Sequence, residues 1–209
     1  KALSILNDDS IQFLVRIAMF HYFIGYIHPF YDGNGRLGRF ISSYLLSKDL
    51  DPLIGYRLSF TIKENLSSYY KAFKDTNDSH NKADLTPFII TFLEIILKAE
   101  KQLYLALLER MESLIKYQNI VFKTKNLVSD KNKDLIYILI QAALFSDKGV
   151  CTKDLLDILV ISRTTLSKRL NYIKKKSLLV ATKDGTEKYY KFDLEQLGKI
   201  SSEKEAPDL

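Results

Sequence analysis

One uninterrupted stretch constrains the fold of this chain more than any other. Residues Phe88–Gln118 contain no glycine and no proline, and Thr86 and Pro87 precede them where a helix cap and a first helical turn are expected. The pattern therefore predicts one long helix. A helix of this length is unusual within a globular domain, so we expect it to reach a second domain or a partner.

The sequence before this stretch predicts further helices. Ser10–Ile27 is apolar on most faces and indicates a buried helix capped by Ser10. Arg36–Leu50 and Thr61–Thr76 repeat apolar residues at helical spacing. With 46% hydrophobic and 27% charged residues, the composition is typical of a globular protein. We therefore expect a mainly α-helical fold.

A second region begins after a change in composition near Lys123–Asp134, which we interpret as a linker. Beyond it the pattern predicts three short helices, the second capped by Thr152 and the third by Ser162, and then two strands around the turn Asp184-Gly185. This is the order of elements in a winged helix-turn-helix. The predicted organisation is a helical domain over 1–122, a linker over 123–132, a winged helix-turn-helix over 133–196 and a polar tail over 197–209.

The most informative motif is HPFYDGNGRLGR, His28–Arg39, which joins two of the predicted helices. Its Gly-Asn-Gly segment allows successive backbone N–H groups to form a concave nest, and the N-terminus of a helix attracts anions. Its two arginines lie three positions apart, so both reach the same side of the second helix. The residues expected to bind phosphate groups are Gly33, Asn34, Gly35, Arg36 and Arg39.

Asp32 and His28 complete the chemistry of this motif. A carboxylate beside an anion site repels phosphate unless a cation lies between them, and Mg²⁺ is a hard ion that carboxylate and phosphate oxygens share. A neutral imidazole can remove the proton from an incoming hydroxyl. The motif therefore predicts nucleotidyl or phosphoryl transfer, although each residue alone is more often structural. It is not a Walker loop, because the Gly-Lys-Ser/Thr triplet and a preceding strand are both missing from the sequence.

The motif resembles the signature of the Fic-domain family, His-Pro-Phe-x-Asp/Glu-Gly-Asn-Gly-Arg-x-x-Arg, without a departure. Tyr69–Phe73 and Asp84–Leu93 resemble later helices of that fold, so the resemblance covers about Ile11–Gln118. It implies a Fic-type helical bundle and a protein adenylyltransferase. Such an enzyme transfers AMP from ATP, with Mg²⁺, to a Tyr, Thr or Ser hydroxyl of a target protein or of itself.

The resemblance also implies a role for each motif residue. His28 would be the general base, Phe30 would anchor the loop in the core and Asp32 would hold Mg²⁺. The Gly-Asn-Gly segment would cradle the phosphates, and the two arginines would bind the β and γ phosphates. Two other functions stay open on the same residues. One is removal of AMP from a modified protein, and the other is a DNA-binding regulator whose Fic-like half only binds a nucleotide.

Two further elements of such proteins are not evident in the sequence. They are a β-hairpin flap that aligns the target segment, and an inhibitory helix with a Ser/Thr-x-x-x-Glu-Gly/Asn pattern. Because the chain starts with Lys1 rather than Met, we expect a fragment or a processed chain. The Fic-type bundle is therefore expected to be partial, with the inhibitory helix upstream or on another chain.

The predicted winged helix-turn-helix contributes most of the chain's net charge of +6. Its basic residues gather in Ser162–Ser177 and near Lys183–Lys191, the expected recognition helix and wing, and this is the charge pattern of DNA binding. Protein docking or dimerisation, including a homodimer, stays open as the alternative. The candidate DNA-facing residues are Arg163, Thr164, Thr165, Lys168 and Arg169.

The remaining candidate residues have simpler interpretations. His21 is expected to be a packed structural residue, and His80 to be solvated in a polar loop. Tyr69 and Tyr70 are expected to pack in the core, and the lining of an adenine pocket is the less favoured alternative. The single cysteine, Cys151, indicates a small buried residue in a reducing cytosol. No apolar run of the sequence is long enough for a membrane span, so we expect a cytoplasmic protein.

Overall fold

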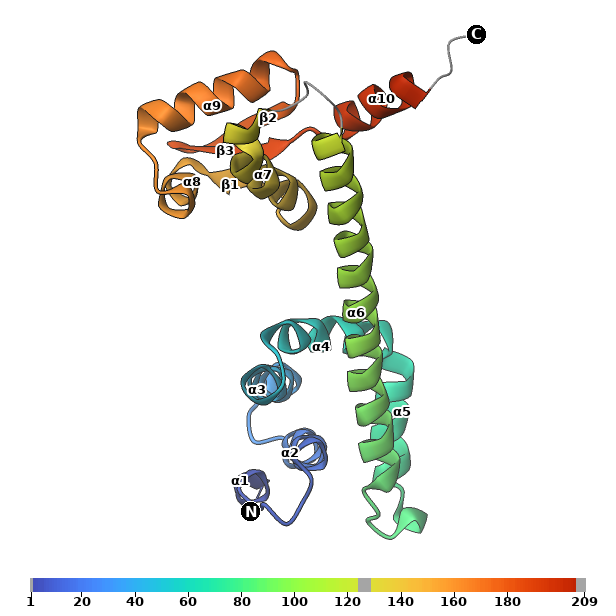
Figure 1. Ribbon diagram of the computed structural model, residues 1–209. Coiled ribbons are helices and arrows are strands. Elements are labelled where there is room, and N and C mark those ends of the chain that lie inside the picture. Colours follow the sequence, from blue (N-terminus) through green and yellow to red (C-terminus); the bar gives the residue numbers. More distant parts are fainter. Residues whose placement is uncertain (1, 124–128, 206–209) are drawn as a thin grey trace. The chain divides into compact units, whose positions relative to one another are not determined.

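The computed structural model describes residues 2–123 and 129–205 of the chain (Figure 1). The fold is mainly helical, as the sequence predicts. The chain divides into two compact units, Lys1–Ala106 and Leu107–Leu209. The division falls inside the long helix, so each unit receives part of that helix.

The first unit is built from helices alone among its described residues (Figure 1). Its elements are α1 (Ala2–Leu6), α2 (Phe13–Ile27), α3 (Asn34–Asp49), α4 (Pro52–Glu64), α5 (Leu66–Asn77), the short 3-10 helix η1 (Ser79–Asn81) and the first part of α6 (Thr86–Lys123). The core of this unit combines apolar side chains from α2, α3, α4, α5 and α6. Its largest fully buried members include Ile17, Leu46, Leu58, Phe88 and Phe92.

The long helix predicted from the sequence is confirmed as α6. Its first turns place Phe88, Phe92 and Ala99 in the core of the first unit, at spacings that keep them on one face. Near its other end, Val121 belongs to the core of the second unit. Because no glycine or proline interrupts α6 after Pro87, one helix contributes side chains to both cores.

The helix predicted over Thr61–Thr76 is wrong in its bounds. Asn65 interrupts it, so that Thr61 belongs to the end of α4 and Thr76 to α5. The Asn65 side-chain amide donates to the Thr61 carbonyl at 2.6 Å and so satisfies a terminal acceptor of α4. Helix α4, which the sequence pattern did not predict, begins at Pro52 after the cap Asp51, whose carboxylate accepts the Leu53 N–H at 2.8 Å.

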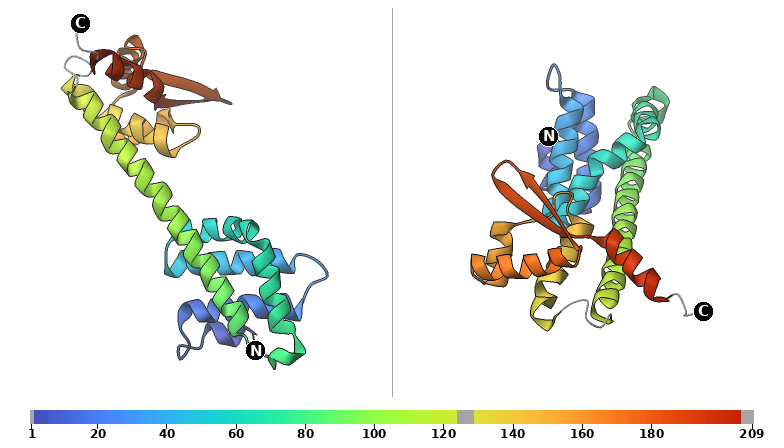
Figure 2. Two further views of the ribbon diagram at one scale, coloured as in Figure 1. Left: turned by 90° about the vertical axis from the view of Figure 1, so that its right-hand side faces the viewer. Right: turned by 90° about the horizontal axis from the view of Figure 1, so that it is seen from above.

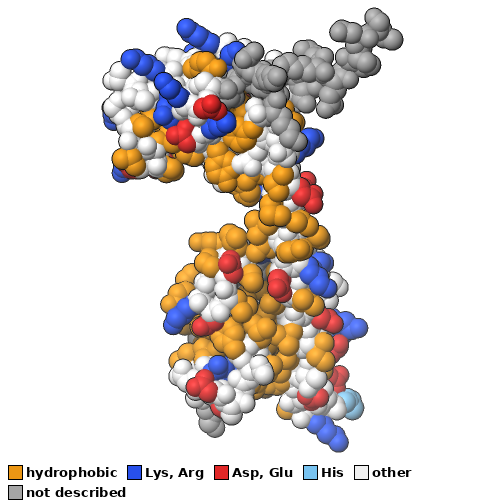
Figure 3. All heavy atoms as spheres, in the orientation of Figure 1, with side chains coloured by type: hydrophobic (Ala, Val, Ile, Leu, Met, Phe, Trp, Pro, Cys, Tyr) orange, Lys and Arg blue, Asp and Glu red, His pale blue; other side chains and the backbone are white. Residues whose placement is uncertain are grey.

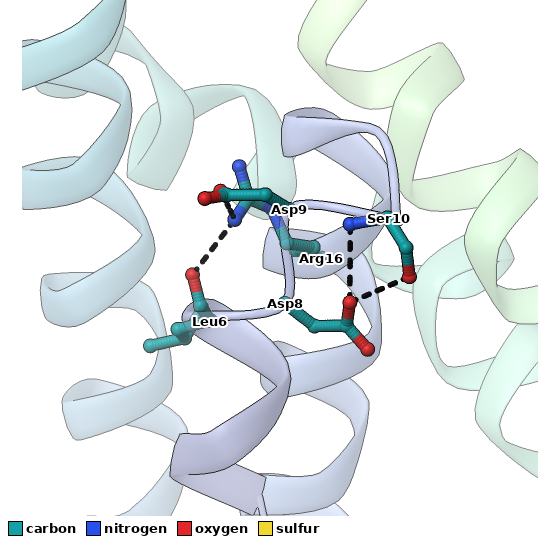
Figure 4. A network of polar contacts seen from close by, with 5 residues as sticks. All are labelled: Leu6, Asp8, Asp9, Ser10 and Arg16. Carbon is teal, nitrogen blue, oxygen red and sulfur yellow. Dashed lines mark hydrogen bonds and ion pairs between the residues drawn. The ribbon is translucent and has the colours of Figure 1, made fainter.

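The loop between α1 and α2 is fixed by polar contacts (Figure 4). Arg16 donates from Nη1 to the Leu6 carbonyl at 3.1 Å and to the Asp9 carboxylate at 2.8 Å. The backbone N–H and the hydroxyl of Ser10 both donate to Oδ1 of Asp8, at 3.1 and 2.5 Å. Ser10 does not cap α2 as predicted, because the helix begins at Phe13 and Gln12 occupies the N-cap position.

The other predicted caps have mixed outcomes. Thr86 is the first residue of α6 rather than its cap, and its N–H donates to the Asp84 carboxylate at 2.9 Å. Thr152 likewise begins its helix rather than capping it. Ser162 is confirmed as a cap, because its Oγ accepts the Thr165 N–H at 3.2 Å.

The second unit combines helices with a small antiparallel sheet. Its elements after α6 are η2 (Asp130–Asn132), α7 (Lys133–Phe145), β1 (Val150–Cys151), α8 (Thr152–Leu159), α9 (Arg163–Lys175), β2 (Leu179–Asp184), β3 (Glu187–Phe192) and α10 (Leu194–Glu205). The strand order is β1-β3-β2, with Val150 opposite Tyr190 and Leu179 opposite Phe192. Figure 2 shows the β2–β3 hairpin as a long two-stranded ribbon. The order of three helices and a hairpin is the predicted one, and the sheet is compatible with a wing.

Of the predicted linker over 123–132, residues 124–128 lie outside the described residues, and η2 follows them. Helix α10 occupies much of the stretch that the sequence predicts as a polar tail over 197–209, and Leu197 is fully buried there.

None of the helices in the described part of the chain combines the length and the hydrophobicity that crossing a lipid bilayer requires.

Candidate active site

The motif His28–Arg39 lies where α2 ends and α3 begins. His28 follows the last turn of α2 in a left-handed conformation, with φ 50°, and Gly33 precedes α3 with φ 87°. Glycine adopts such a φ without the steric cost of a β-carbon, and histidine is among the residues found there more often than most. These two positions turn the chain sharply, so that the loop stands exposed between the helices.

Asn34 holds this loop in place. Its side-chain Oδ1 accepts the Phe30 N–H at 3.0 Å, and its Nδ2 donates to the Phe30 carbonyl at 2.7 Å. Asn34 is only 2% exposed, whereas Phe30 exposes 56% of its surface. The expectation that the Phe30 ring anchors the loop in the core is therefore wrong. The backbone of Phe30 is held instead, because a buried amide satisfies both of its polar groups.

The exposed imidazole of His28 is oriented by the end of its own helix. Its Nδ1 lies 3.1 Å from the Gly25 carbonyl oxygen. A carbonyl oxygen only accepts hydrogen bonds, so Nδ1 carries a proton in this contact, and in the neutral imidazole Nε2 then keeps the lone pair. The geometry therefore presents a proton acceptor on the outer side of the ring.

Asp32 and Arg36 interact with each other. Oδ2 of Asp32 lies 2.9 Å from Nη2 of Arg36, and Oδ1 accepts the Gly33 N–H at 2.6 Å. The two side chains are 82% and 75% exposed. A pair this exposed contributes roughly 0–1 kcal/mol, so an incoming anion can displace it at small cost. The Asp32 carboxylate therefore occupies the Gly33 N–H, one of the backbone donors that were expected to bind phosphate.

Arg39 lies one turn further along α3 and is half-buried. It forms no ion pair with any of the described residues. A β-carbon on Gly35 would lie 3.3 Å from Nη1 of Arg39, so the guanidinium lies directly over the first turn of the helix. The structure thus gathers the expected base, carboxylate, glycines and arginines within one loop and the first turns of α3.

A cavity of about 890 Å³ adjoins the two arginines in the first unit. It follows α3 from Arg36 and Arg39 to Ser47, and α4 and α5 form its other walls. Figure 3 shows hydrophobic side chains gathered over α3 and α4 on this unit. The aromatic residues of the cavity wall are Phe40, Tyr44, Tyr56 and Tyr70.

These wall residues were missed by sequence reasoning, apart from Tyr70. Tyr70 was expected in the core but is 62% exposed, so that expectation is wrong. Phe40 and Tyr44 continue from Arg36 at intervals of four, a signal that one face of α3 runs along the cavity. Tyr56 gave no signal, because it belongs to the unpredicted helix α4.

A second histidine, His21, lies in a buried polar cluster beneath the loop. Its Nδ1 is 2.9 Å from Oγ of Ser42, and its Nε2 is 2.8 Å from the hydroxyl of Tyr69. The rings of Phe88 and Phe92 pack beside it. Burial, and secondly the nearby positive charge of Arg39, lower the pKa of His21 to about 3.

The expectation of a structural His21 is confirmed, since the ring is neutral and has both nitrogens engaged. Tyr69 is 5% exposed, which confirms its expected place in the core, and this burial raises its pKa to about 12. His80 is exposed as expected, and its Nδ1 lies 2.9 Å from Asp78.

The structure places the five DNA-facing candidates together on α9 but gives them different surroundings. Arg163, Thr164 and Lys168 are exposed. Thr165 is engaged at the helix cap, where its hydroxyl lies 2.9 Å from Oγ of Ser162. The fifth candidate, Arg169, differs most from the other four in its surroundings.

Arg169 is used inside the second unit. Its Nη1 lies 2.9 and 3.1 Å from the two carboxylate oxygens of Asp134 on α7, and its side chain is 22% exposed. Arg169 therefore holds α9 to α7, and the expectation that it faces a ligand is wrong.

Comparison with known proteins relates the loop to one family. A sequence model described as Fic/DOC family matches residues 1–46, which contain the whole motif. Two relatives are named "Protein adenylyltransferase Fic". The protein from Drosophila erecta is 34% identical over 87 residues, which cover 40% of this chain and 16% of that protein. The protein from Drosophila grimshawi is 34% identical over 83 residues, which cover 40% of this chain and 15% of that protein.

The chain therefore spans about one sixth of the length of the curated relatives it matches. Among solved structures, a Fic family protein from Desulfovibrio desulfuricans matches with a TM-score of 0.46 and 24% identity. That match covers 92% of this chain and 53% of the other chain.

Proposed function

We propose, from the premise that this chain is a Fic-domain protein, that it transfers AMP from ATP to a hydroxyl side chain of a protein. The observation that carries the proposal is the intact motif His28–Arg39, in which a proton acceptor, a carboxylate and two arginines share one loop and the helix that follows. The activity named for the Drosophila relatives supports the same reaction.

In the proposed reaction, the hydroxyl oxygen of the target attacks the α-phosphorus of ATP. A new oxygen–phosphorus bond forms, the bond between the α-phosphorus and its bridging oxygen to the β-phosphate breaks, and pyrophosphate leaves. The hydroxyl proton passes to Nε2 of His28. The contact of Nδ1 with the Gly25 carbonyl supports this role, because it fixes the tautomer whose Nε2 accepts a proton.

The two arginines act on the phosphates that leave. Arg36 exchanges its exposed contact with Asp32 for phosphate oxygens, at the small cost that an exposed ion pair implies. Arg39 has no carboxylate partner among the described residues, so its charge is available to a ligand. Both guanidinium groups then offset the negative charge that develops on pyrophosphate.

Asp32 is the residue that would hold Mg²⁺. Its side chain is exposed, and no group of three or more metal-ligating side chains exists among the described residues. A single accessible carboxylate fits Mg²⁺, which commonly takes one or two protein carboxylates and completes its shell with phosphate oxygens and water. When bound, the ion would supply neutralisation of phosphate charge.

The test is label transfer from ATP to protein, with the chain itself offered as acceptor alongside a mixture of candidate proteins. Label placed on the α-phosphate is expected to stay on protein, while label on the γ-phosphate is expected to leave with pyrophosphate. Substituting His28→Ala should reduce labelling by roughly 10²–10⁴-fold, the usual loss on removing a general base.

Two further variants make this test specific. His28→Asn also removes the base but tolerates the left-handed backbone of this position, so it separates lost chemistry from a distorted loop. His80→Ala removes another exposed imidazole of the same unit and should leave labelling unchanged. Undiminished labelling in both His28 variants would refute the role of His28. Retention of the γ label in place of the α label would show phosphoryl transfer instead.

A further inference from the structure

A groove in the second unit lies between α9 and the β2–β3 hairpin. Its volume is about 420 Å³. Cationic side chains line it from both sides, namely Arg163 and Lys174 from the helix and Lys183 and Lys188 from the hairpin. The groove therefore lies between two elements that both carry positive charge.

None of these four cations forms an ion pair with the described residues. Elsewhere in the unit, by contrast, several basic side chains are paired with a carboxylate. These paired residues are Lys133 with Asp130, Lys148 with Asp184, Arg169 with Asp134 and Lys199 with Glu195. Four cations without an ion pair among the described residues thus meet where the helix faces the hairpin.

The hairpin gives a second, independent indication. Lys183 and Lys188 are register partners across β2 and β3. Like charges directly opposite each other in an antiparallel pair destabilise a sheet. The neighbouring pair, Asp184 and Glu187, is also of like charge, but Lys148 offsets Asp184 and the Tyr189 hydroxyl donates to Glu187 at 2.9 Å. Among the described residues the lysine pair has no such partner, so a bound anion would remove its repulsion.

The face of α9 that lines the groove carries hydrogen-bonding side chains as well as charge. Arg163, Ser167, Asn171 and Lys174 follow one another at intervals of four, four and three, and all four are exposed. The helix contains no acidic residue. Arginine and asparagine are the side chains that read guanine and adenine edges through paired hydrogen bonds, and lysine and serine contact phosphate.

We infer that this groove binds double-stranded DNA. The exposed face of α9 enters the major groove, and the lysine pair of the hairpin contacts the neighbouring phosphates, as in a winged helix-turn-helix. Duplex RNA fits this surface less well, because its major groove is too deep and narrow for side chains to read. The inference concerns residues of the second unit and is independent of the proposed AMP transfer.

The experiment measures binding of a fluorescent DNA duplex of mixed sequence to the full chain by anisotropy, over a series of salt concentrations. The test variant is Lys183→Gln with Lys188→Gln. Each lost phosphate contact should lower the salt dependence, the slope of log K against log salt, by about one, so the double variant should lose about two and bind roughly tenfold more weakly.

The matched control is Lys133→Gln with Lys199→Gln, which removes the same charge from residues outside the groove. It should retain nearly the wild-type slope. Thermal melting checks folding, and the groove variant should melt no lower than wild type, because it loses a repulsive pair.

A second variant tests the helix. Arg163→Gln with Lys174→Gln should weaken DNA binding as the hairpin variant does, while Arg169→Gln should lower the melting temperature without changing the slope. Equal DNA binding by the groove and control variants would overturn the inference. So would the absence of DNA binding at low salt, or stronger competition by duplex RNA or by vesicles of anionic lipid than by unlabelled DNA.

Discussion

His21 and His28 lie seven residues apart, one within α2 and one just after its end, yet their surroundings give them opposite properties. His21 is 2% exposed, has both ring nitrogens in hydrogen bonds and stacks against phenylalanine rings. His28 is exposed, has one ring nitrogen in contact with a carbonyl and the other directed away from that contact. The difference teaches that a histidine in a buried network stabilises the fold, whereas one at a helix end with a free nitrogen is able to do chemistry.

The comparison is tested most strongly by removing each ring. His21→Ala leaves the hydroxyls of Ser42 and Tyr69 without their buried partner and opens a cavity beside Phe92. It should lower the free energy of unfolding by about 2–4 kcal/mol. His28→Asn should change that free energy by less than about 0.5 kcal/mol, because the site is exposed and asparagine accepts its backbone conformation. Urea denaturation measures both, and equal losses would refute the comparison.

A second prediction concerns the anchoring of the loop. Asn34→Ala removes two buried hydrogen bonds to the backbone of Phe30 and should cost about 1–3 kcal/mol of stability. Phe30→Ala removes a ring that is more than half exposed and should cost less. Thermal melting of both variants checks this order. A larger loss for Phe30→Ala would restore the ring as the anchor.

A third prediction uses acid to separate the two histidines. The folded pKa of His21, about 3, lies below the ordinary value of 6.5. Between these values the unfolded chain binds a proton that the folded chain does not, so the free energy of unfolding falls as the pH falls below 6.5. The slope should approach about 1.4 kcal/mol per pH unit.

Urea denaturation between about pH 6.5 and pH 5 isolates this contribution, because unperturbed carboxyl groups titrate lower. The comparison is made with His21→Gln, which should lack this part of the slope, and with His28→Gln, which should keep it. An unchanged slope in His21→Gln would show that other groups cause the acid sensitivity.

The smallest effect is expected at the exposed pair of the loop. Asp32→Asn breaks the contact with Arg36, but both side chains are largely exposed, so stability should change by roughly 0–1 kcal/mol. The proposed activity should fall much more, and should be less responsive to added Mg²⁺. Label transfer measured over a Mg²⁺ series checks this, and an activity that is unaffected would remove Asp32 from the site.

Local sequence patterns predicted much of the fold and all the residues that make up the loop. The long helix followed from the lack of breakers before Gln118, and the hairpin followed from the Asp184-Gly185 turn. These features depend on residues close together in the sequence. Helix α4 was missed because its position depends on close packing against α3, where a β-carbon added to Gly55 would lie only 2.5 Å from the Ser43 carbonyl oxygen.

By itself, the sequence determined which residues form the loop and the order in which they occur, because a helix end, a glycine turn and a helix start are set by near neighbours. Only the tertiary structure decided which side chains are buried, and which are paired with another side chain. It assigned the anchor to Asn34 rather than Phe30, paired Arg169 with a carboxylate 35 positions away, and left Lys183 opposite Lys188. Burial and partnership depend on residues far apart in the sequence, and no local pattern records them.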